Sequence, residues 1–180
     1  MIYLISDTHL NHRNIIEYEN RPFKSIEEMN DTIIKRWNAT VKPEDTIIHL
    51  GDICLGKESI LNYLIPNLNG HKILLKGNHD CKSNHFYLNC GFDEVYNTMW
   101  LDYMGLKIFL SHYPAARPEN GETYDLHFYG HVHGNGHRGE FPTIARNGAC
   151  LCVERWEYTP VAIEEVIIQC KQSGITCQEI

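Results

Sequence analysis

The chain has 180 residues, of which 43% are hydrophobic and 22% charged, a composition typical of a soluble globular domain with its own core. No apolar stretch is long enough to cross a bilayer, and the first residues lack the basic lead of a signal peptide, so we expect a cytoplasmic protein without a membrane segment. The net charge of −7 argues against an extended nucleic-acid surface. It does not argue against a phosphate-bearing substrate, because bound metal ions can dominate the local charge.

In the first half of the chain, predicted strands alternate with predicted helices. Ser25 and Glu28 have the spacing of a capping box, and the apolar residues that follow recur at helical spacing, so we expect a helix that ends before Pro43. The other expected elements are strands at 2–6, 46–50 and 72–76, a helix at 58–64 and a helical turn within 84–90.

The second half is richer in strands. We expect strands at 94–103 and 106–110 with a turn at Gly105, and further strands at 127–129, 144–146 and 161–163. Residues 164–172 fit either a helix or a strand. The pattern predicts an α/β protein with one mixed sheet, or with two sheets packed face to face and helices outside.

Potential metal ligands or proton carriers follow five of the predicted strands. They are Asp7 and His9, Asp52, Asn78 with His79 and Asp80, His112, and His131 with His133. In open α/β sheets, sites form at the carboxyl ends of the strands, so we expect these groups to converge. Residues two apart point the same way in an extended chain, which would pair Asp7 with His9 and His131 with His133. Gly51 and Gly77 would permit sharp turns beside a crowded centre.

The donor types favour transition metals. Carboxylate, amide and imidazole together suit Mn, Fe, Zn or Co better than Ca or Mg. The donors exceed the needs of one ion, which indicates two metals that could clamp a phosphate. The seven cysteines follow no zinc-site spacing, so we interpret them as reduced thiols, with Cys150 and Cys152 as a weak alternative metal pair.

The ordered motifs Asp-x-His, Gly-Asp, Gly-Asn-His-Asp, His and Gly-His-x-His, running from Asp7 to His133, resemble the calcineurin-like metallophosphoesterase superfamily. Segments 6–12, 20–23 and 155–160 are further similar to small single-domain bacterial and phage phosphoesterases. The resemblance implies one domain over residues 1–180 with a four-layer αββα sandwich, in which two mixed sheets pack face to face with helices outside.

The resemblance also implies roles for the motif residues. The ligands of the first metal would be Asp7, His9 and His133, those of the second Asn78, His112 and His131, and the bridge between them Asp52. His79 would be the general acid, held in place by Asp80, and a metal-bridging hydroxide would attack the phosphate in line. Two divalent ions are therefore expected as cofactors, with Mn or Fe favoured and Ni, Zn or Co as alternatives.

Substrate contacts are less defined. His12 follows the Asp-x-His motif closely and could touch a phosphate, or could be a loop histidine. In predicted loops, Arg13, Arg21 and Arg117 could bind phosphate oxygens or could be solvated surface charges. We expect the loops at 112–126 and 134–142 to cover the cleft, and Asn147 to support the ligand edge.

These features favour a phosphodiesterase that acts on a small phosphodiester or nucleotide. A phosphomonoesterase on a small phosphorylated metabolite and a catalytically weak binding module remain alternatives, although binding modules of this superfamily usually lose the histidine equivalent to His79. Protein Ser/Thr phosphatases carry an arginine shortly after Gly-Asp and another before Gly-Asn-His, whereas this chain has Ile53 to Gly56 and Lys76 there. The oligomeric state is not encoded in any motif.

Overall fold

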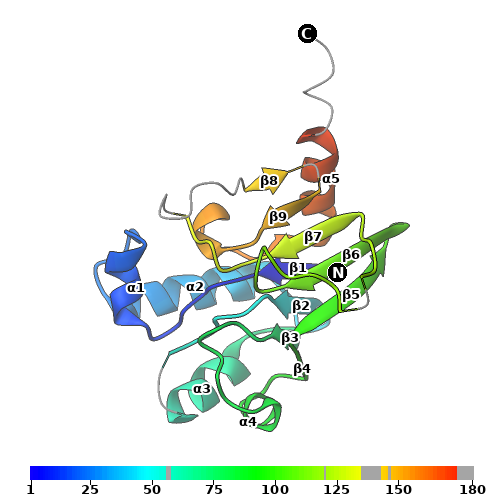
Figure 1. Ribbon diagram of the computed structural model, residues 1–180. Helices are drawn as coiled ribbons and strands as arrows, with labels where there is room; N and C mark the ends of the chain where they lie inside the picture. The colour runs from blue at the N-terminus through cyan, green and yellow to red at the C-terminus, as the bar shows by residue number, and fades with distance from the viewer. Residues whose placement is uncertain (56–57, 120, 135–142, 146, 174–180) are drawn as a thin grey trace.

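Two five-stranded mixed sheets packed face to face form the centre of the computed structural model, which describes residues 1–55, 58–119, 121–134, 143–145 and 147–173 (Figure 1). The first sheet has the order β10-β1-β2-β3-β4 and the second the order β5-β6-β7-β9-β8. Strands β1 to β4 run parallel, as do β6, β7 and β9, while β10, β5 and β8 are antiparallel to their neighbours. The parallel strands of each sheet therefore share a carboxyl edge.

The strands of the first sheet are β1 (Ile2–Ile5), β2 (Thr46–His49), β3 (His71–Leu75), β4 (Glu94–Tyr96) and β10 (Val161–Ala162). Those of the second are β5 (Thr98–Tyr103), β6 (Leu106–Ser111), β7 (Leu126–Tyr129), β8 (Ile144–Ala145) and β9 (Gly148–Cys150). The helices are α1 (Arg13–Tyr18), α2 (Ile26–Thr40), α3 (Glu58–Leu64), α4 (Asn84–Asn89) and α5 (Ile163–Ser173), with short 3-10 turns η1 (Ile65–Asn67) and η3 (Val153–Arg155).

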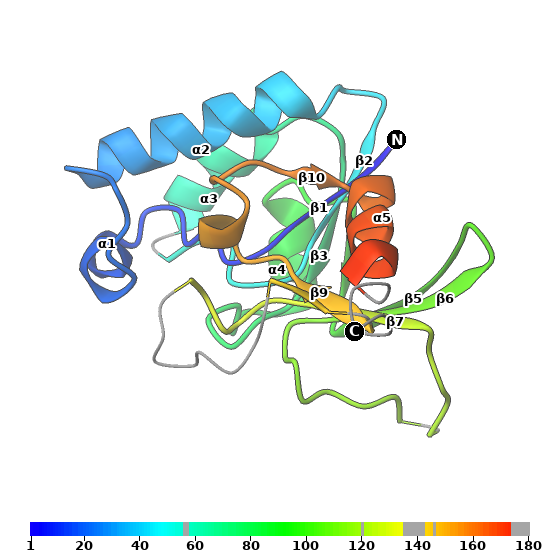
Figure 2. The same cartoon turned by 90° about the horizontal axis from the view of Figure 1, so that it is seen from above.

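The helices complete an αββα arrangement, as expected. Figure 2 shows α2 and α3 on the opposite side of β1 to β3 from β6 and β7. Helix α5 contacts β8 and β9 of the second sheet as well as β1 and β10 of the first, so it closes the side of the sandwich where both sheets end. Its residues Ile163 and Val166 belong to the same apolar cluster as Phe128, so this helix borders the core between the two sheets.

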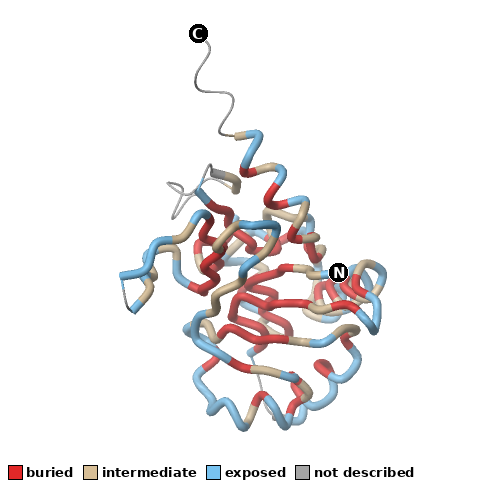
Figure 3. The backbone as a smooth tube through the Cα atoms, turned by 90° about the vertical axis from the view of Figure 1, so that its right-hand side faces the viewer, coloured by how far each residue is buried: buried red, intermediate tan, exposed pale blue. Residues whose placement is uncertain are grey.

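The central strands are largely buried (Figure 3). Their apolar side chains belong to two core clusters, one on each face of the first sheet. Ile47 packs toward α2 with Met29 and Trp37, whereas its neighbour Ile48 packs between the sheets with Phe128. All five side chains are at most 1% exposed. Full burial on both faces explains why these strands are continuous apolar runs rather than alternating ones.

The N-terminus of α2 has the predicted cap, with one difference. The Ser25 hydroxyl accepts a hydrogen bond from the backbone N–H of Glu28 at 3.2 Å. The Glu28 carboxylate returns to the N–H of Lys24, one residue before the position that a standard capping box uses. The helix ends at Thr40, before Pro43 as predicted.

Three expected elements were wrong in detail. The segment 94–103 is not one strand: β4 pairs with β3 in the first sheet, and after Asn97 the chain enters β5, which pairs with β6 in the second. Ile163 begins α5 instead of ending a strand, and the segment after it is helical. Arg13, expected in a loop, begins the short helix α1.

Candidate metal centre

The carboxyl edges of the two sheets meet at one place, where backbone hydrogen bonds join the loops that follow the strands. Asp7 N–H donates to the carbonyl of Gly51 at 2.9 Å, and His9 N–H donates to that of Asp52 at 3.0 Å. A bridge between Ser6 and Cys152 then links the end of β1 to the segment after β9 in the other sheet. The predicted convergence of the strand ends is confirmed.

These loops are not extended, contrary to the expectation from the two-residue spacing. Asp7, His9, Asp52, His131 and His133 all have left-handed backbone, with φ between 48° and 71°. Non-glycine residues seldom adopt this conformation and tend to do so at functional sites. The side chains are therefore aimed inward by strained turns rather than by strand pleating.

Glycines make room for this crowding. Gly51 has φ of +101°, and a side chain there would approach His112 Nδ1 to 2.6 Å. Gly77 has no such φ, but a Cβ atom there would overlap the Asp52 carboxylate. The two glycines thus serve different needs, a backbone turn at Gly51 and close approach at Gly77.

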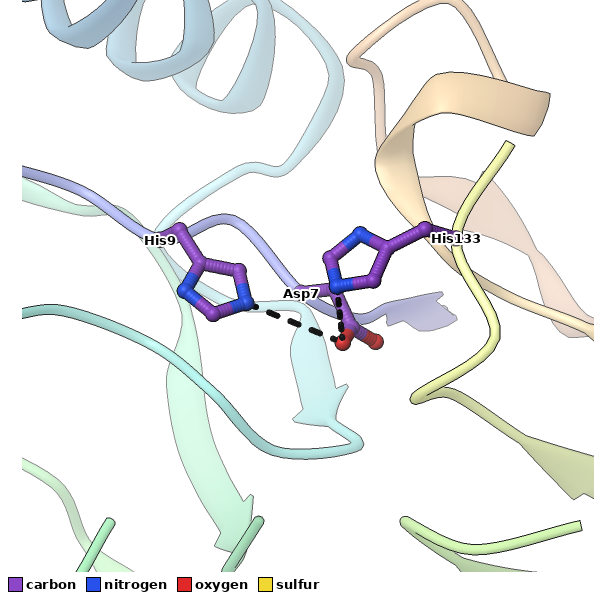
Figure 4. Close-up of side chains that lie close together, drawn as sticks. All are labelled: Asp7, His9 and His133. Carbon is purple, nitrogen blue, oxygen red and sulfur yellow. Dashed lines mark ion pairs between the residues drawn. The ribbon is translucent and has the colours of Figure 1, made fainter. Parts of the chain in front are cut away.

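One group of donors surrounds Asp7 (Figure 4). Its Oδ1 atom lies 3.5 Å from His133 Nε2 and 3.9 Å from His9 Nε2. The other oxygen, Oδ2, accepts hydrogen bonds from the Ser6 hydroxyl at 2.5 Å and from His131 N–H at 2.9 Å. Asp7 Oδ1 and His9 Nε2 are buried and have no hydrogen-bond partner among the described residues. Buried polar atoms of this kind are costly unless something else binds them.

A second group of donors surrounds Asp52 and His112. Asp52 Oδ2 lies 3.5 Å from His112 Nε2 and also 3.5 Å from His9 Nε2 of the first group. Asn78 Oδ1 lies 3.0 Å from both His112 Nε2 and His131 Nδ1. One carboxylate oxygen of Asp52 thus lies between the two groups.

Three of the imidazoles share one arrangement, in which Nδ1 is held by the protein and Nε2 points into the centre. Nδ1 of His112 contacts the Leu50 carbonyl at 2.8 Å, that of His133 contacts Glu154 Oε1 at 3.1 Å, and that of His9 contacts His12 Nδ1 at 3.2 Å. Metal-binding histidines are normally oriented in this way by a partner on the second nitrogen. The donor set and its orphaned atoms therefore fit two divalent metal ions.

The charges of these groups reflect their burial and one another. Burial would raise the pKa of Asp7, but the surrounding imidazoles, with His133 first among them, hold it below its usual range. Burial and the charge of Asp7 raise the pKa of Asp52 to about 6, and burial lowers that of His9 well below its usual value. Burial opposes protonation of His133, but its bond to Glu154 and the charge of Asp7 prevail and raise its pKa to about 9. His133 thus keeps a proton at neutral pH that a metal ion would have to displace.

The thiols beside this centre do not share its chemistry. Cys152 Sγ lies 3.3 Å from both Cys150 Sγ and Asp7 Oδ2. Burial, together with the neighbouring Cys150, raises the pKa of Cys152 well above its usual value, so its thiol stays protonated. Cys152 therefore supports Asp7 as a weak hydrogen-bond donor.

His79 and Asp80 lie next to the centre in different ways. The His79 side chain is exposed, and its ring centre lies 5.2 Å from that of His9. The backbone N–H of His79 donates to Asp52 Oδ1 at 2.8 Å. Asp80 is buried and accepts hydrogen bonds from the N–H groups of Asp52 at 2.6 Å and Gly77 at 2.9 Å. Asp80 therefore ties the loops after β2 and β3 together, rather than holding the His79 ring as the resemblance implied.

The predicted phosphate contacts separate into different environments. His12 is partly buried and bonds to His9, while Arg13 and Arg117 are exposed. Arg21 is buried, with its guanidinium directed at the backbone carbonyls of Asp7 and Thr8, so neither a phosphate contact nor a solvated charge describes it.

Two further expectations concerned residues around the ligand edge. Asn147 does not support this edge, because it precedes β9 and its carbonyl accepts from His127 N–H at the opposite end of the strands. The loop at 112–126 starts at the centre, where Tyr113 lies 4.8 Å from the His131 ring, but Tyr124 returns to stack on Phe109 in the second sheet. Residues 135–142 of the other expected loop lie outside the described residues.

Two supporting residues were not identified from the sequence. His49 is buried behind the centre, where its Nδ1 accepts from Gly51 N–H at 3.1 Å and its Nε2 lies 3.0 Å from the Thr8 hydroxyl. Glu154 binds both Arg21 and His133. His49 ends a strand and Glu154 lies in a 3-10 turn, and neither belongs to a motif with a known spacing.

The combined geometry agrees with sequence comparison. A model of the calcineurin-like phosphoesterase superfamily domain matches residues 1–154. The chain belongs to this superfamily. Within the described residues, no helix is both long and apolar enough to span a membrane.

The chain is also similar to individual proteins in sequence and in structure. The uncharacterized protein MJ1445 of Methanocaldococcus jannaschii is 38% identical over 175 residues, covering 92% of this chain and 89% of that protein. The gene 66 protein of Mycobacterium phage L5 is 35% identical over 81 residues, covering 43% of this chain and 39% of that protein. The crystal structure of AQ665, a protein of unknown function from Aquifex aeolicus, is 31% identical with a TM-score of 0.70, and the match covers 92% of this chain and 97% of that one.

Proposed function

We propose that this superfamily member is a two-metal phosphodiesterase that hydrolyses a small phosphodiester or nucleotide. The observation that carries the proposal is the position of Asp52 Oδ2, 3.5 Å from a histidine nitrogen of each donor group. A carboxylate oxygen in that place can bridge two ions, and a pair of bridged ions suits displacement at phosphorus.

The proposed ligands divide along the two groups. Asp7, His9 and His133 would hold one ion, and Asn78, His112 and His131 the other, with Asp52 shared. When bound, such ions lower the pKa of water and neutralise charge on the phosphate. Mn or Fe is favoured by the mixture of oxygen and nitrogen donors.

The remaining residues orient groups and move protons. His79 is exposed beside the donors, where its ring can give a proton to the leaving oxygen of a bound ester. Asp80 ties the loop that carries Asp52 to the loop that carries Asn78, through hydrogen bonds from the backbone N–H groups of Asp52 and Gly77. His12, whose ring lies 6.0 Å from that of His79, is a further candidate contact for phosphate.

The arginines near the centre favour a diester over a monoester. Arg21 donates to the carbonyls of Asp7 and Thr8, and Arg155 donates to the carbonyl of His133 at 2.6 Å. These bonds direct both guanidinium groups at the backbone of the ligand loops. A diester carries one negative charge and a monoester up to two, so two arginines committed to backbone carbonyls favour the diester.

A substrate screen tests the proposal. Purified protein would be assayed with an aryl phosphodiester, cyclic nucleotides and an aryl phosphomonoester, each with Mn²⁺, Fe²⁺, Ni²⁺ or Zn²⁺. We expect turnover of a diester that exceeds monoester turnover and disappears with a chelator. Faster monoester turnover would replace the diester assignment, and well-folded protein without turnover under any condition would leave a binding module as the better interpretation.

A further inference from the structure

Arg21 and Glu154 form a buried ion pair beside the metal centre, although they are 133 residues apart in the sequence. Arg21 Nη2 lies 2.6 Å and Nε 2.9 Å from Glu154 Oε1. The side chain of Arg21 is fully buried and that of Glu154 is 6% exposed. Removing charged groups from water is costly, so a pair like this one needs further compensation.

The compensation comes from the backbone and side chain of the first donor group. Arg21 Nη2 donates to the carbonyl of Asp7 at 2.7 Å, and Nη1 donates to that of Thr8 at 2.8 Å. Glu154 Oε1 lies 3.1 Å from His133 Nδ1, the nitrogen that faces away from Asp7. One ion pair thus reaches the loop that carries Asp7 and His9, and it also reaches the ring of His133.

Aromatic and backbone contacts fix the pair in place. The Arg21 guanidinium lies 5.8 Å from the ring centre of Tyr158, and Phe23 packs edge-on against the same ring at 4.8 Å. Arg36 of α2 hydrogen-bonds the carbonyl of Glu157 in the same segment. The sequence segments 20–23 and 155–160, which no proposed catalytic step uses, therefore build the surroundings of this pair.

We propose that Arg21 and Glu154 are positioning residues that set the affinity and geometry of the first metal ion. Glu154 fixes the ring orientation of His133 and increases the basicity of its free nitrogen, as carboxylates do for metal-binding histidines. Arg21 compensates the buried charge of Glu154 and fixes the backbone on both sides of the Asp7 peptide. The inference rests on the proposed function, because it requires a metal at Asp7, His9 and His133.

Cobalt binding tests the proposal without using turnover. Metal-free wild type, Glu154→Gln, Arg21→Lys and the control Arg36→Lys would be titrated with Co²⁺, followed by calorimetry and by the visible d–d absorption. Circular dichroism would establish that each metal-free protein is folded. Glu154→Gln keeps the shape but removes the charge, and Arg21→Lys keeps the charge but cannot make all of the hydrogen bonds of the guanidinium group. Arg36 is a matched control because it anchors the same segment without touching a donor.

Each affinity is corrected for the proton that the metal displaces from His133, because Glu154→Gln also reduces that competition. After this correction we expect both test variants to weaken one of the two binding events by about 10- to 100-fold and to alter the d–d spectrum, while the other event and Arg36→Lys stay within about twofold of wild type. The variant with both substitutions should bind Co²⁺ only slightly less tightly than the single variant with the lower affinity, since the two residues act as one unit.

Unchanged cobalt affinity in folded Glu154→Gln and Arg21→Lys would overturn the inference, as would an equal loss in Arg36→Lys. Failure of both test variants to fold would assign the pair to stability alone, which also overturns it. If only one of the two test variants folds, the inference stands or falls with the cobalt affinity of that variant. A wild type that binds no Co²⁺ would instead refute the metal centre itself.

Discussion

Competition between protons and metal at His133 gives the most direct quantitative test of the first donor group. The pKa of His133 is raised to about 9 in the metal-free protein, because its bond to Glu154 and the charge of Asp7 outweigh burial. A metal ion needs the neutral imidazole, so it must displace this proton at any pH below about 9. Metal affinity should therefore increase as the pH rises.

The size of the effect follows from the fraction of unprotonated His133. With a pKa of about 9, that fraction is about 1% at pH 7 and about 24% at pH 8.5, which predicts an affinity increase of about 20-fold for the first ion. Asp7 contributes no proton, since its pKa lies below the usual range, and neither does His9, whose pKa is also lowered.

Calorimetric titration with Mn²⁺ at pH 7 and pH 8.5 would measure the affinity, and buffers of different ionisation enthalpy would count the protons released. We expect about one proton from this group at pH 7. The variant Glu154→Gln should flatten the pH dependence, because a neutral amide replaces the carboxylate whose hydrogen bond contributes most to raising the pKa of His133. If the affinity for the first metal ion changes by less than about threefold between pH 7 and pH 8.5, the assignment of His133 as a ligand is refuted.

Other predictions address different parts of the molecule. Asp52→Asn should weaken both metal-binding events by more than about 100-fold, because Asp52 Oδ2 lies between the two donor groups. If Asp52 does not bind both ions, calorimetry would show one binding event unaffected. His79→Ala should bind metal normally, by elemental analysis, but lose about 10²- to 10⁴-fold in turnover; unchanged turnover would contradict its role as general acid. Burial lowers the pKa of His127 to about 4, so the unfolded chain takes up a proton that the folded protein resists. The free energy of unfolding, measured by urea denaturation, should accordingly fall by about 3 kcal/mol from this residue between pH 6.5 and pH 4. In His127→Gln the free energy of unfolding should fall less over the same pH range. Trp37→Ala should lower the free energy of unfolding by about 3–5 kcal/mol, measured by urea denaturation, because its side chain is fully buried and its Nε1 bonds to the Asn69 carbonyl; a loss below about 1 kcal/mol would show that the core there can collapse.

The sequence by itself determined the donors and the edge at which they meet. Each donor follows an apolar run that is buried on both faces, and runs of this kind predict strands without knowledge of their partners. The carboxyl ends of parallel strands share an edge, so the position of Asp7, Asp52 and Asn78 after their strands was enough to predict their proximity. The helix after Ser25 could likewise be predicted from local sequence alone, since its cap and its apolar spacing lie within the segment.

The tertiary structure decided what depends on distant partners. Nothing within residues 94–103 marks Asn97 as the crossing between sheets, because β4 and β5 differ only in the strands they pair with. The left-handed turns at Asp7 and His133 likewise depend on contacts that cross the sandwich.

Arg21 shows the same limit for the metal centre. Its sequence neighbours give no indication that it is buried, and its carboxylate partner lies 133 residues further along the chain. A charged residue can be buried only where another segment provides the opposite charge and hydrogen-bond acceptors. The sequence therefore determined which atoms could bind a metal, and only the folded chain determined what holds them in place.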